Sequence, residues 1–233
     1  MNYYKKTMTF KEGENTLIVR ATFPFDNSYE DSVTFFVDSI NPRIINQYPS
    51  NKRYTNGTFY VTYTEENLDN VVLFYKGTEL DYKSAGPITA CTAGKNQKCF
   101  FDISNELKTY HPDGTPITYY FVVKDYAKHE AKSRIIYTET VDTSIPKITV
   151  TSPDPDITQP RRVPIQIIVS DSIKGVNLKY SIDSGRFTTL CSSCDSINTK
   201  KTLAAGPHTL KVMATDKAGN TRTTDIISFT VAA

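Results

Sequence analysis

Four cysteines are the residues of this 233-residue chain with the clearest chemistry: Cys91 and Cys99, and the C-x-x-C pair Cys191 and Cys194. Both pairs occupy a similar place in a repeating pattern of predicted strands, which favours one disulfide within each pair. Loop-closure entropy assigns about 2.6 kcal/mol to the first bridge and about 1.9 kcal/mol to the second. Paired cysteines in small β modules indicate an oxidising compartment, so we expect an extracellular or cell-surface location.

A zinc site is the alternative use of the same cysteines. The pair Cys191 and Cys194 has metal-ligand spacing, and all four thiolates could complete a tetrahedral site. That site would have to join two modules whose equivalent loops we expect to lie far apart. A redox role for the C-x-x-C pair needs a helix N-terminus nearby, and residues 195–199 do not have a helical pattern. We therefore favour disulfides.

The acidic residues suggest calcium as a candidate cofactor. Asp142, Asp154, Asp156, Asp216 and Asn220 supply oxygen ligands near the predicted module ends, which is the chemistry that calcium requires. The interpretation we favour is that they are turn residues whose side chains bond to their own backbone. The sequence therefore predicts no cofactor and no metal, with calcium as the alternative.

Asn56 begins an Asn-Gly-Thr sequence, which is both an N-glycosylation sequon and a tight turn between strands. The turn alone explains these residues, and Asn56 is the glycosylation candidate if the protein is secreted. The fifteen tyrosines could form a sugar-binding face, but most lie within strand patterns, where core or cross-strand packing is expected. Examples are Tyr60, Tyr75, Tyr119, Tyr120 and Tyr180.

Catalysis has no recognisable machinery in the sequence. His111, His129 and His208 show no paired spacing, and no H-E-x-x-H, G-x-S-x-G, P-loop or dinucleotide-binding motif is present. We therefore predict that the chain is not an enzyme. The formal net charge of +2 provides no field that would steer nucleic acid, and no window of about eighteen apolar residues exists. We expect no nucleic-acid partner and no membrane insertion in this segment.

A repeat accounts for the elements that position these residues. The segment Val37–Pro42 returns as Val141–Pro146 about 100 residues later, a typical length for an immunoglobulin-like sandwich. Each copy follows one alternating strand and precedes another. Its proline lacks the N–H that a strand ladder needs. We interpret both copies as module boundaries.

A pattern of alternating apolar residues, a polar turn and a final strand occurs three times, as expected for a closing hairpin that packs one face on a core. The alternating residues are Leu17, Val19 and Ala21; Tyr119, Phe121 and Val123; and Leu210, Val212 and Ala214. The polar turns begin at Asp26, Asp125 and Asp216, and the final strands are Asp31–Val37, Ser133–Val141 and Asp225–Val231.

The opening strands occur only twice. They are Phe59–Tyr63 with Val71–Tyr75, and Val163–Val169 with Leu178–Ile182. The prediction is an all-β fold of tandem immunoglobulin-like β-sandwiches with the first one incomplete. Residues 1–40 are the C-terminal half of a truncated module, because half a sandwich cannot bury a core, and residues 41–143 and 144–233 are one module each. One helical turn over Asp102–Thr109, with Ser104 as its cap, is the only helix expected.

The segment Ala214–Asn220 and the strand after it resemble the closing hairpin of bacterial and archaeal Ig-like, or fibronectin-III-like, repeats of cell-surface proteins. Val141–Pro146 resembles their junctions, and Leu190–Cys194 resembles modules of predicted archaeal surface proteins. The resemblance covers residues 41–233 well and residues 1–40 partly. The turn glycine is missing at Phe23–Asn27 and at Tyr126–His129, so the sequence does not predict the shared turn geometry at these places.

The resemblance implies a cell-surface or secreted multidomain protein whose modules act as stalk, spacer or adhesive surface. We expect a non-catalytic structural or adhesion stalk in which rigid sandwiches hold a distal part away from the surface. Its partners would be neighbouring Ig-like modules of the same longer chain. The alternatives are a module that binds a surface glycan or protein, and an accessory domain of a secreted hydrolase. The full open reading frame distinguishes the hydrolase alternative.

Overall fold

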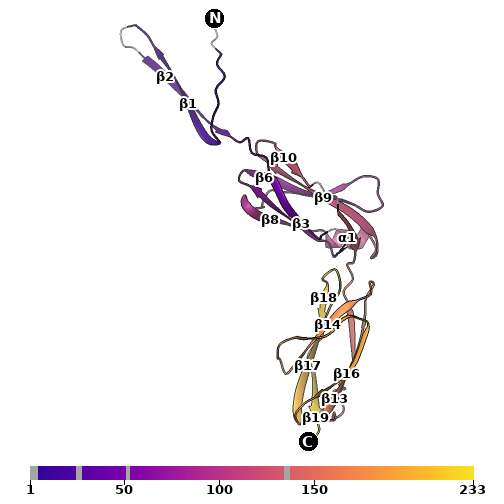
Figure 1. Cartoon of the computed structure of the whole chain (residues 1–233). Helices are drawn as coiled ribbons and strands as arrows, with labels where there is room; N and C mark the ends of the chain where they lie inside the picture. The colour runs from indigo at the N-terminus through magenta and orange to yellow at the C-terminus, as the bar shows by residue number, and fades with distance from the viewer. Residues whose placement is uncertain (1–4, 25–27, 51–52, 134–136) are drawn as a thin grey trace.

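The computed structural model describes residues 5–24, 28–50, 53–133 and 137–233. Strands dominate it, and they form three parts that follow one another from the N-terminal to the C-terminal end (Figure 1). We call these parts the N-terminal hairpin, the middle sandwich and the C-terminal sandwich. The polar turn expected to begin at Asp26 lies outside the described residues. The same holds for Phe25–Asn27 of the segment that lacks the turn glycine.

The N-terminal hairpin consists of β1 (Gly13–Thr22) and β2 (Ser28–Val37), which pair along their whole length from Gly13 with Val37 to Thr22 with Ser28. Its apolar side chains are open to solvent, with Val19 59% exposed and Val33 54% exposed. A two-stranded ribbon has no second layer to cover them. The assignment of residues 1–40 as half a module stays a prediction.

The middle sandwich has two facing sheets. The smaller sheet has the order β3 (Arg43–Tyr48), β5 (Thr58–Glu65), β8 (Gly94–Asp102). The larger sheet has the order β4 (Tyr54–Thr55), β11 (Tyr137–Val141), β9 (Pro116–Asp125), β6 (Leu68–Lys76), β7 (Lys83–Ile88), and β10 (Glu130–Lys132) also pairs with β9. Apolar side chains from both sheets form one buried cluster between them.

The C-terminal sandwich repeats this plan. Its smaller sheet is β12 (Lys147–Ser152), β13 (Arg162–Ser170), β16 (Ser196–Thr202). Its larger sheet is β15 (Thr188–Cys194), β14 (Val176–Ile182), β17 (Gly206–Thr215), β18 (Thr221–Thr223), with β19 (Ile227–Val231) also on β17. It encloses a second buried cluster that shares no residue with the first. The predicted all-β fold of tandem Ig-like sandwiches is confirmed.

The two-residue rhythm of the closing hairpins selects the core. The alternating residues Tyr119, Phe121 and Val123 of β9 are all fully buried, and so are their counterparts in β17. Successive side chains of a strand point to opposite faces, so one face of each hairpin meets the smaller sheet. The same rhythm in β1 produces an apolar face without a covering sheet.

The final strand expected at Asp225–Val231 is present as β19, which begins at Ile227, and the separate short strand β18 precedes it. The N–H of Thr224 donates to the Val212 carbonyl at 2.9 Å, while its hydroxyl accepts from the Val212 N–H at 3.1 Å. Thr224 thus makes both hydrogen bonds to Val212, one with its backbone and one with its side chain. Asp225 and Ile226 then belong to no strand. Ser133 bonds to Phe121 in the same way between β10 and β11.

The expected helical turn is present as α1 (Ser104–Tyr110), but its expected cap is wrong. Ile103 occupies the cap position, and the Asp102 carboxylate accepts the Ser104 N–H at 2.9 Å. Hydrogen bonds from the Ser104 side chain and from its N–H lower the pKa of Asp102. Leu107 anchors the helix in the core of the middle sandwich. Among the described residues, no helix is both long and apolar enough to cross a membrane.

Candidate functional site

The structure pairs all four cysteines within their own sandwiches. Cys91, in the segment from β7 to β8, is bonded to Cys99 of β8, with 5.4 Å between the Cα atoms. Because β7 and β8 belong to different sheets, this bridge fixes the crossing between them. Cys99 is fully buried in the core.

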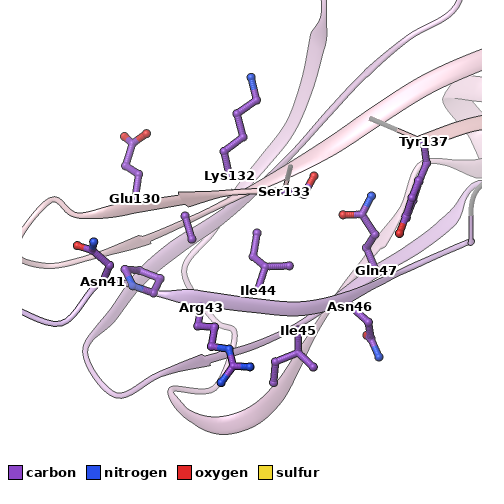
Figure 2. A pocket seen from close by; sticks show the side chains of 12 residues that line it. Asn41, Arg43, Ile44, Ile45, Asn46, Gln47, Glu130, Lys132, Ser133 and Tyr137 are labelled. Atoms are coloured by element: carbon purple, nitrogen blue, oxygen red, sulfur yellow. The ribbon is translucent and has the colours of Figure 1, made fainter. Parts of the chain in front are cut away.

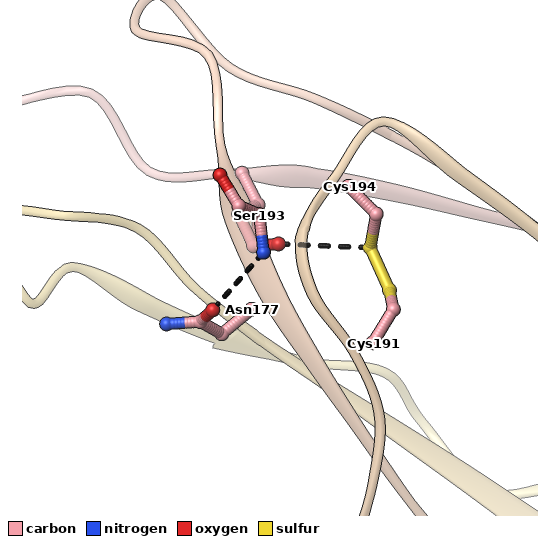
Figure 3. Close-up of a disulfide and its surroundings, with 5 residues drawn as sticks. Asn177, Cys191, Ser193 and Cys194 are labelled. Carbon is pink, nitrogen blue, oxygen red and sulfur yellow. Dashed lines mark hydrogen bonds between the residues drawn. A yellow bond between two sulfur atoms is a disulfide. The ribbon is translucent and has the colours of Figure 1, made fainter.

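The second disulfide has a different geometry. Cys191 and Cys194 both lie in β15, with 6.2 Å between their Cα atoms, and close a bulge against β14 (Figure 3). Ser193 has a φ of 59° and donates its N–H to the Asn177 side chain at 3.2 Å. The two pairs share only their place near the crossing between sheets. The alternative four-cysteine zinc site does not form, because the pairs lie in separate sandwiches.

Asn56 lies in the turn between β4 and β5. Its side-chain oxygen accepts the Thr58 N–H at 3.1 Å. Gly57 has a φ of +98°, and a Cβ at this position would lie 2.3 Å from the Ser104 backbone, so the turn requires glycine. The turn therefore explains the sequon locally, and glycosylation of Asn56 stays a prediction.

A groove of about 580 Å³ lies along the open edge of the middle sandwich, between β3 and β10 (Figure 2). Ile44 points into this groove, while Arg43 and Ile45 point to the other face of β3. Glu130 and Lys132 extend away from it. The charged side chains at its border do not converge on its floor, as they would in a site that orients a ligand.

A cluster of three carboxylates lies at the second junction, which joins the middle and C-terminal sandwiches. One carboxylate oxygen each of Asp142, Asp171 and Asp216 lies within 4.8 Å of the others. Asp142 follows β11, Asp171 follows β13, and Asp216 follows β17. Both sandwiches therefore contribute to the cluster.

Burial and mutual repulsion dominate the electrostatics of this cluster. Asp142 is fully buried, and its burial, together with the charges of Asp216 and Asp171, raises its pKa to about 7. Burial and the charge of Asp216 also raise the pKa of Asp171. The carboxyl groups thus resist ionisation in the absence of a compensating positive charge.

Hydrogen bonds across the second junction hold the two sandwiches together. Ser172 donates its hydroxyl to Asp113 at 2.7 Å and lies 3.2 Å from the Asp142 carboxylate. The Asn220 amide donates to the Asp142 carbonyl oxygen and to the Asp216 carboxylate, each at 2.8 Å. Although burial opposes it, bonds from Ser144, Thr143 and Ser172 lower the pKa of Asp113.

The calcium candidates from the sequence divide between two places. Asp142, Asp216 and Asn220 come together at the second junction. Asp154 and Asp156 lie between β12 and β13 and form the expected local turn, in which the Asp156 N–H donates to the Asp154 carboxylate at 2.9 Å. Sequence reasoning missed Asp171 and Asp113. Their available signal was weak, since each is only one acidic residue beside a turn.

The first junction, between the N-terminal hairpin and the middle sandwich, contains an equivalent cluster of Asp38, Asp125 and His129. The Asn67 amide donates to Asp38 at 3.0 Å. His129 donates its backbone N–H and its Nδ1–H to Asp125, each at 2.8 Å. Glu65 is buried beside them, and burial with the charges of Asp38 and Asp125 raises its pKa.

The turn from Asp125 to His129 keeps the geometry of its counterpart from Asp216 to Asn220, although it lacks the glycine. Lys128 adopts a φ of 74°, close to the 91° of Gly219. The closing bonds from Asp125 N–H to His129 O and from Asp216 N–H to Asn220 O are 3.2 and 3.1 Å. The missing glycine therefore does not change the turn here.

No family model matches the chain, and no curated protein sequence matches it. Solved structures that it resembles include fibronectin(III)-like modules of Clostridium thermocellum CbhA, with 14% identity, TM-score 0.44, and coverage of 82% of this chain and 94% of that chain. The FN1–FN3 domains of chicken CNTN1 give 11% identity, TM-score 0.46 and coverage of 92% and 76%. A cytokine receptor complex has 11% identity and a TM-score of 0.42, with coverage of 83% of this chain and 97% of that chain. The assignment as an all-β protein of Ig-like sandwiches rests on its own strand order.

Proposed function

We propose that this chain is a non-catalytic spacer or adhesion stalk segment of a secreted or cell-surface multidomain protein. The observation that supports it is the second junction, where side chains of the C-terminal sandwich bond to the middle sandwich. Ser172 bonds to Asp113, and Asn220 bonds to the Asp142 backbone. Such bonds favour one orientation between the sandwiches, which is what a spacer needs to transmit force or maintain distance.

Small-angle X-ray scattering of the purified chain tests this function. A stalk should give an extended particle whose maximum dimension is constant across salt concentrations. The variant Ser172→Ala removes the hydroxyl between Asp113 and Asp142 and should broaden the distance distribution. The control Ser228→Ala, at an exposed position of β19 in the same sandwich, should not. A compact particle from the unmodified chain contradicts the proposal.

The proposed location outside the cytoplasm is supported by the two disulfides. Mass measurement before and after alkylation of freshly isolated native protein should find no free thiol. Four labelled cysteines would contradict this location and favour a reducing compartment.

Ligand binding is the second candidate function, favoured by an aromatic strip on the outer face of the smaller sheet of the middle sandwich. Tyr48 stacks on Tyr60 with 4.9 Å between ring centroids, and Phe100 lies beside Tyr60 at 5.3 Å. Phe100 is 59% exposed, and the Lys98 ammonium lies over the Tyr60 ring. Exposed stacked rings with a nearby cation suit the apolar face and hydroxyl groups of a sugar.

A glycan array with the intact chain tests this candidate. Binding should disappear in Phe100→Ala and persist in Tyr126→Ala, which changes an exposed tyrosine at the first junction. That result would show that the aromatic strip binds the sugar. Consistently blank arrays remove the sugar-binding function.

A further inference from the structure

We propose that the second junction binds a divalent cation, calcium above all, through the carboxylates of Asp142, Asp171 and Asp216. Asp142 comes from the middle sandwich, and the other two come from the C-terminal sandwich. A cation bound to all three carboxylates would therefore link the middle sandwich to the C-terminal sandwich. This inference does not depend on the proposed function, because the site needs only the carboxylate geometry.

The spacing of the oxygens fits calcium. Calcium–oxygen distances are about 2.3–2.6 Å, so two ligands of one ion can be at most about 5 Å apart. The three carboxylates offer one oxygen each, with all separations within 4.8 Å. Separations of this size allow one ion to lie among all three oxygens, with small side-chain adjustments bringing them to bonding distance.

The second observation is that part of this cluster has no partner. The Oδ2 atom of Asp142, a fully buried residue, accepts no hydrogen bond. Both oxygens of Asp171 are enclosed, and neither accepts a bond of regular geometry, although the Ser172 N–H acts to lower the pKa of this group. Buried polar atoms without partners are rare in folded proteins and often indicate an ion or a water.

The charge balance points to a cation. Among the described residues, the ion pairs include none with Asp142, Asp171 or Asp216. An uncompensated buried carboxylate is strongly unfavourable, and three in one place are more so. One divalent ion would offset most of this charge and satisfy the unpartnered oxygens together.

The ligand chemistry favours calcium over other metals. The cluster offers only oxygen, which hard cations prefer, and no thiolate or imidazole belongs to it. Calcium accepts irregular sets of carboxylates completed by water, whereas magnesium requires a near-ideal octahedron at about 2.1 Å. The amide of Asn220 and the hydroxyl of Ser172 already hold the surrounding carboxylates in position.

The test begins with the whole chain, stripped with EGTA and titrated with calcium chloride by isothermal titration calorimetry. We expect saturable binding at the second junction and a calcium-dependent rise in the unfolding temperature. Asp171→Asn should weaken binding on the order of tenfold or more, because it removes a charged ligand. The matched control is Asp154→Asn, in the turn at β12, which should bind calcium as the unmodified chain does.

A crossover in stability separates loss of a ligand from misfolding. In EGTA, Asp171→Asn should unfold at the same or a higher temperature than the unmodified chain, because it removes a repelling charge. In millimolar calcium the order should reverse. The proposal is overturned if neither calcium, magnesium nor manganese binds or shifts the unfolding temperature, or if Asp171→Asn keeps full calcium affinity.

Discussion

Asp38 and Asp142 occupy the same place in the repeat, each one residue beyond the last strand before a junction. At the first junction the amide of Asn67 donates to Asp38, whereas at the second the Oδ2 atom of Asp142 has no partner. The acid at the end of the next closing strand also differs in its surroundings. Asp125 has His129 four residues later, whereas Asp216 has Asn220.

The correspondence extends to two further acids. Arg43 pairs with Thr64, and Lys147 pairs with Ser170, so the acids that follow, Glu65 and Asp171, are equivalent. Likewise, Glu12 accepts the N–H of Ser39 at 3.0 Å. Asp113 accepts the N–H of Thr143 at 2.7 Å in the same way. The two junctions thus share one acidic framework.

The difference between the junctions lies in what balances that framework. The first has an imidazole, an amide and Lys128, whose ammonium lies 2.9 Å from Asp69 and whose pKa the Asp69 and Asp125 carboxylates raise. The second has uncharged donors such as Ser172 and Asn220, and the ion pairs of the described residues include none with its three clustered acids. One framework can therefore be stabilised by protein side chains at one end of a module and require a cation at the other.

The largest expected effect comes from removing the acid at the closing turn. Asp125→Ala loses two bonds from His129 and should lower the free energy of unfolding by roughly 2–3 kcal/mol in EDTA. Asp216→Ala loses two bonds from Asn220 but relieves repulsion with Asp142 and Asp171, so its loss should be only about 1 kcal/mol. Urea unfolding of both variants measures the difference. Equal losses would break the contrast between the junctions.

Glu139 shows the effect of burial alone on a carboxyl group, because it is a buried acid of β11 that belongs to neither cluster. Burial raises its pKa to about 7, although the Arg53 N–H donates to it at 2.8 Å. A folded pKa above the unfolded value means that stability is present at low pH and is lost as pH rises toward about 7. Glu139→Gln should leave stability unchanged at pH 4 and raise it by roughly 1–2 kcal/mol at pH 8. Unfolding curves across this range that stay parallel for both proteins would contradict the expectation.

Asn67→Asp sharpens the comparison by making the first junction resemble the second. It replaces the donor to Asp38 with a carboxylate beside Glu65 and Asp125. In EDTA we expect a loss of about 1 kcal/mol from lost bonding and added repulsion. In millimolar calcium, Asn67→Asp should unfold at the same temperature as the unmodified chain in the same calcium, whereas Asn67→Ala should remain less stable than the unmodified chain. If calcium also brought Asn67→Ala level with the unmodified chain, this explanation would be excluded.

Lys128→Gly tests the smallest difference, that between the two closing turns. Both turns need a positive φ, and a residue with a Cβ adopts it at a penalty of about 1 kcal/mol. The substitution also removes the exposed pair with Asp69, which water screens strongly. Relief of the backbone penalty should therefore give a small net gain in stability by urea unfolding, and a clear loss would show that the pair outweighs the backbone strain.

Two features of the structure that the sequence does not predict have local physical causes. The sequence does not predict a shared turn at Lys128, because a missing glycine usually signals a different backbone, yet the surrounding closing bonds hold this lysine at a positive φ. The final strand predicted at Asp225–Val231 begins only at Ile227, because nothing in its pattern reveals that the Thr224 hydroxyl substitutes for a ladder partner just before it. Both features depend on a neighbouring strand rather than on the segment itself.

The sequence by itself determined the strands, the faces they bury and the repeated sandwich plan. Those features follow from a two-residue side-chain period and from proline and turn positions, which are local properties of the chain. Only the tertiary structure decided that Asp171 joins Asp142 and Asp216, while Asp154 and Asp156 stay apart. The three acids follow strands from two sandwiches, so their meeting depends on how sheets pair and how one sandwich docks on the next.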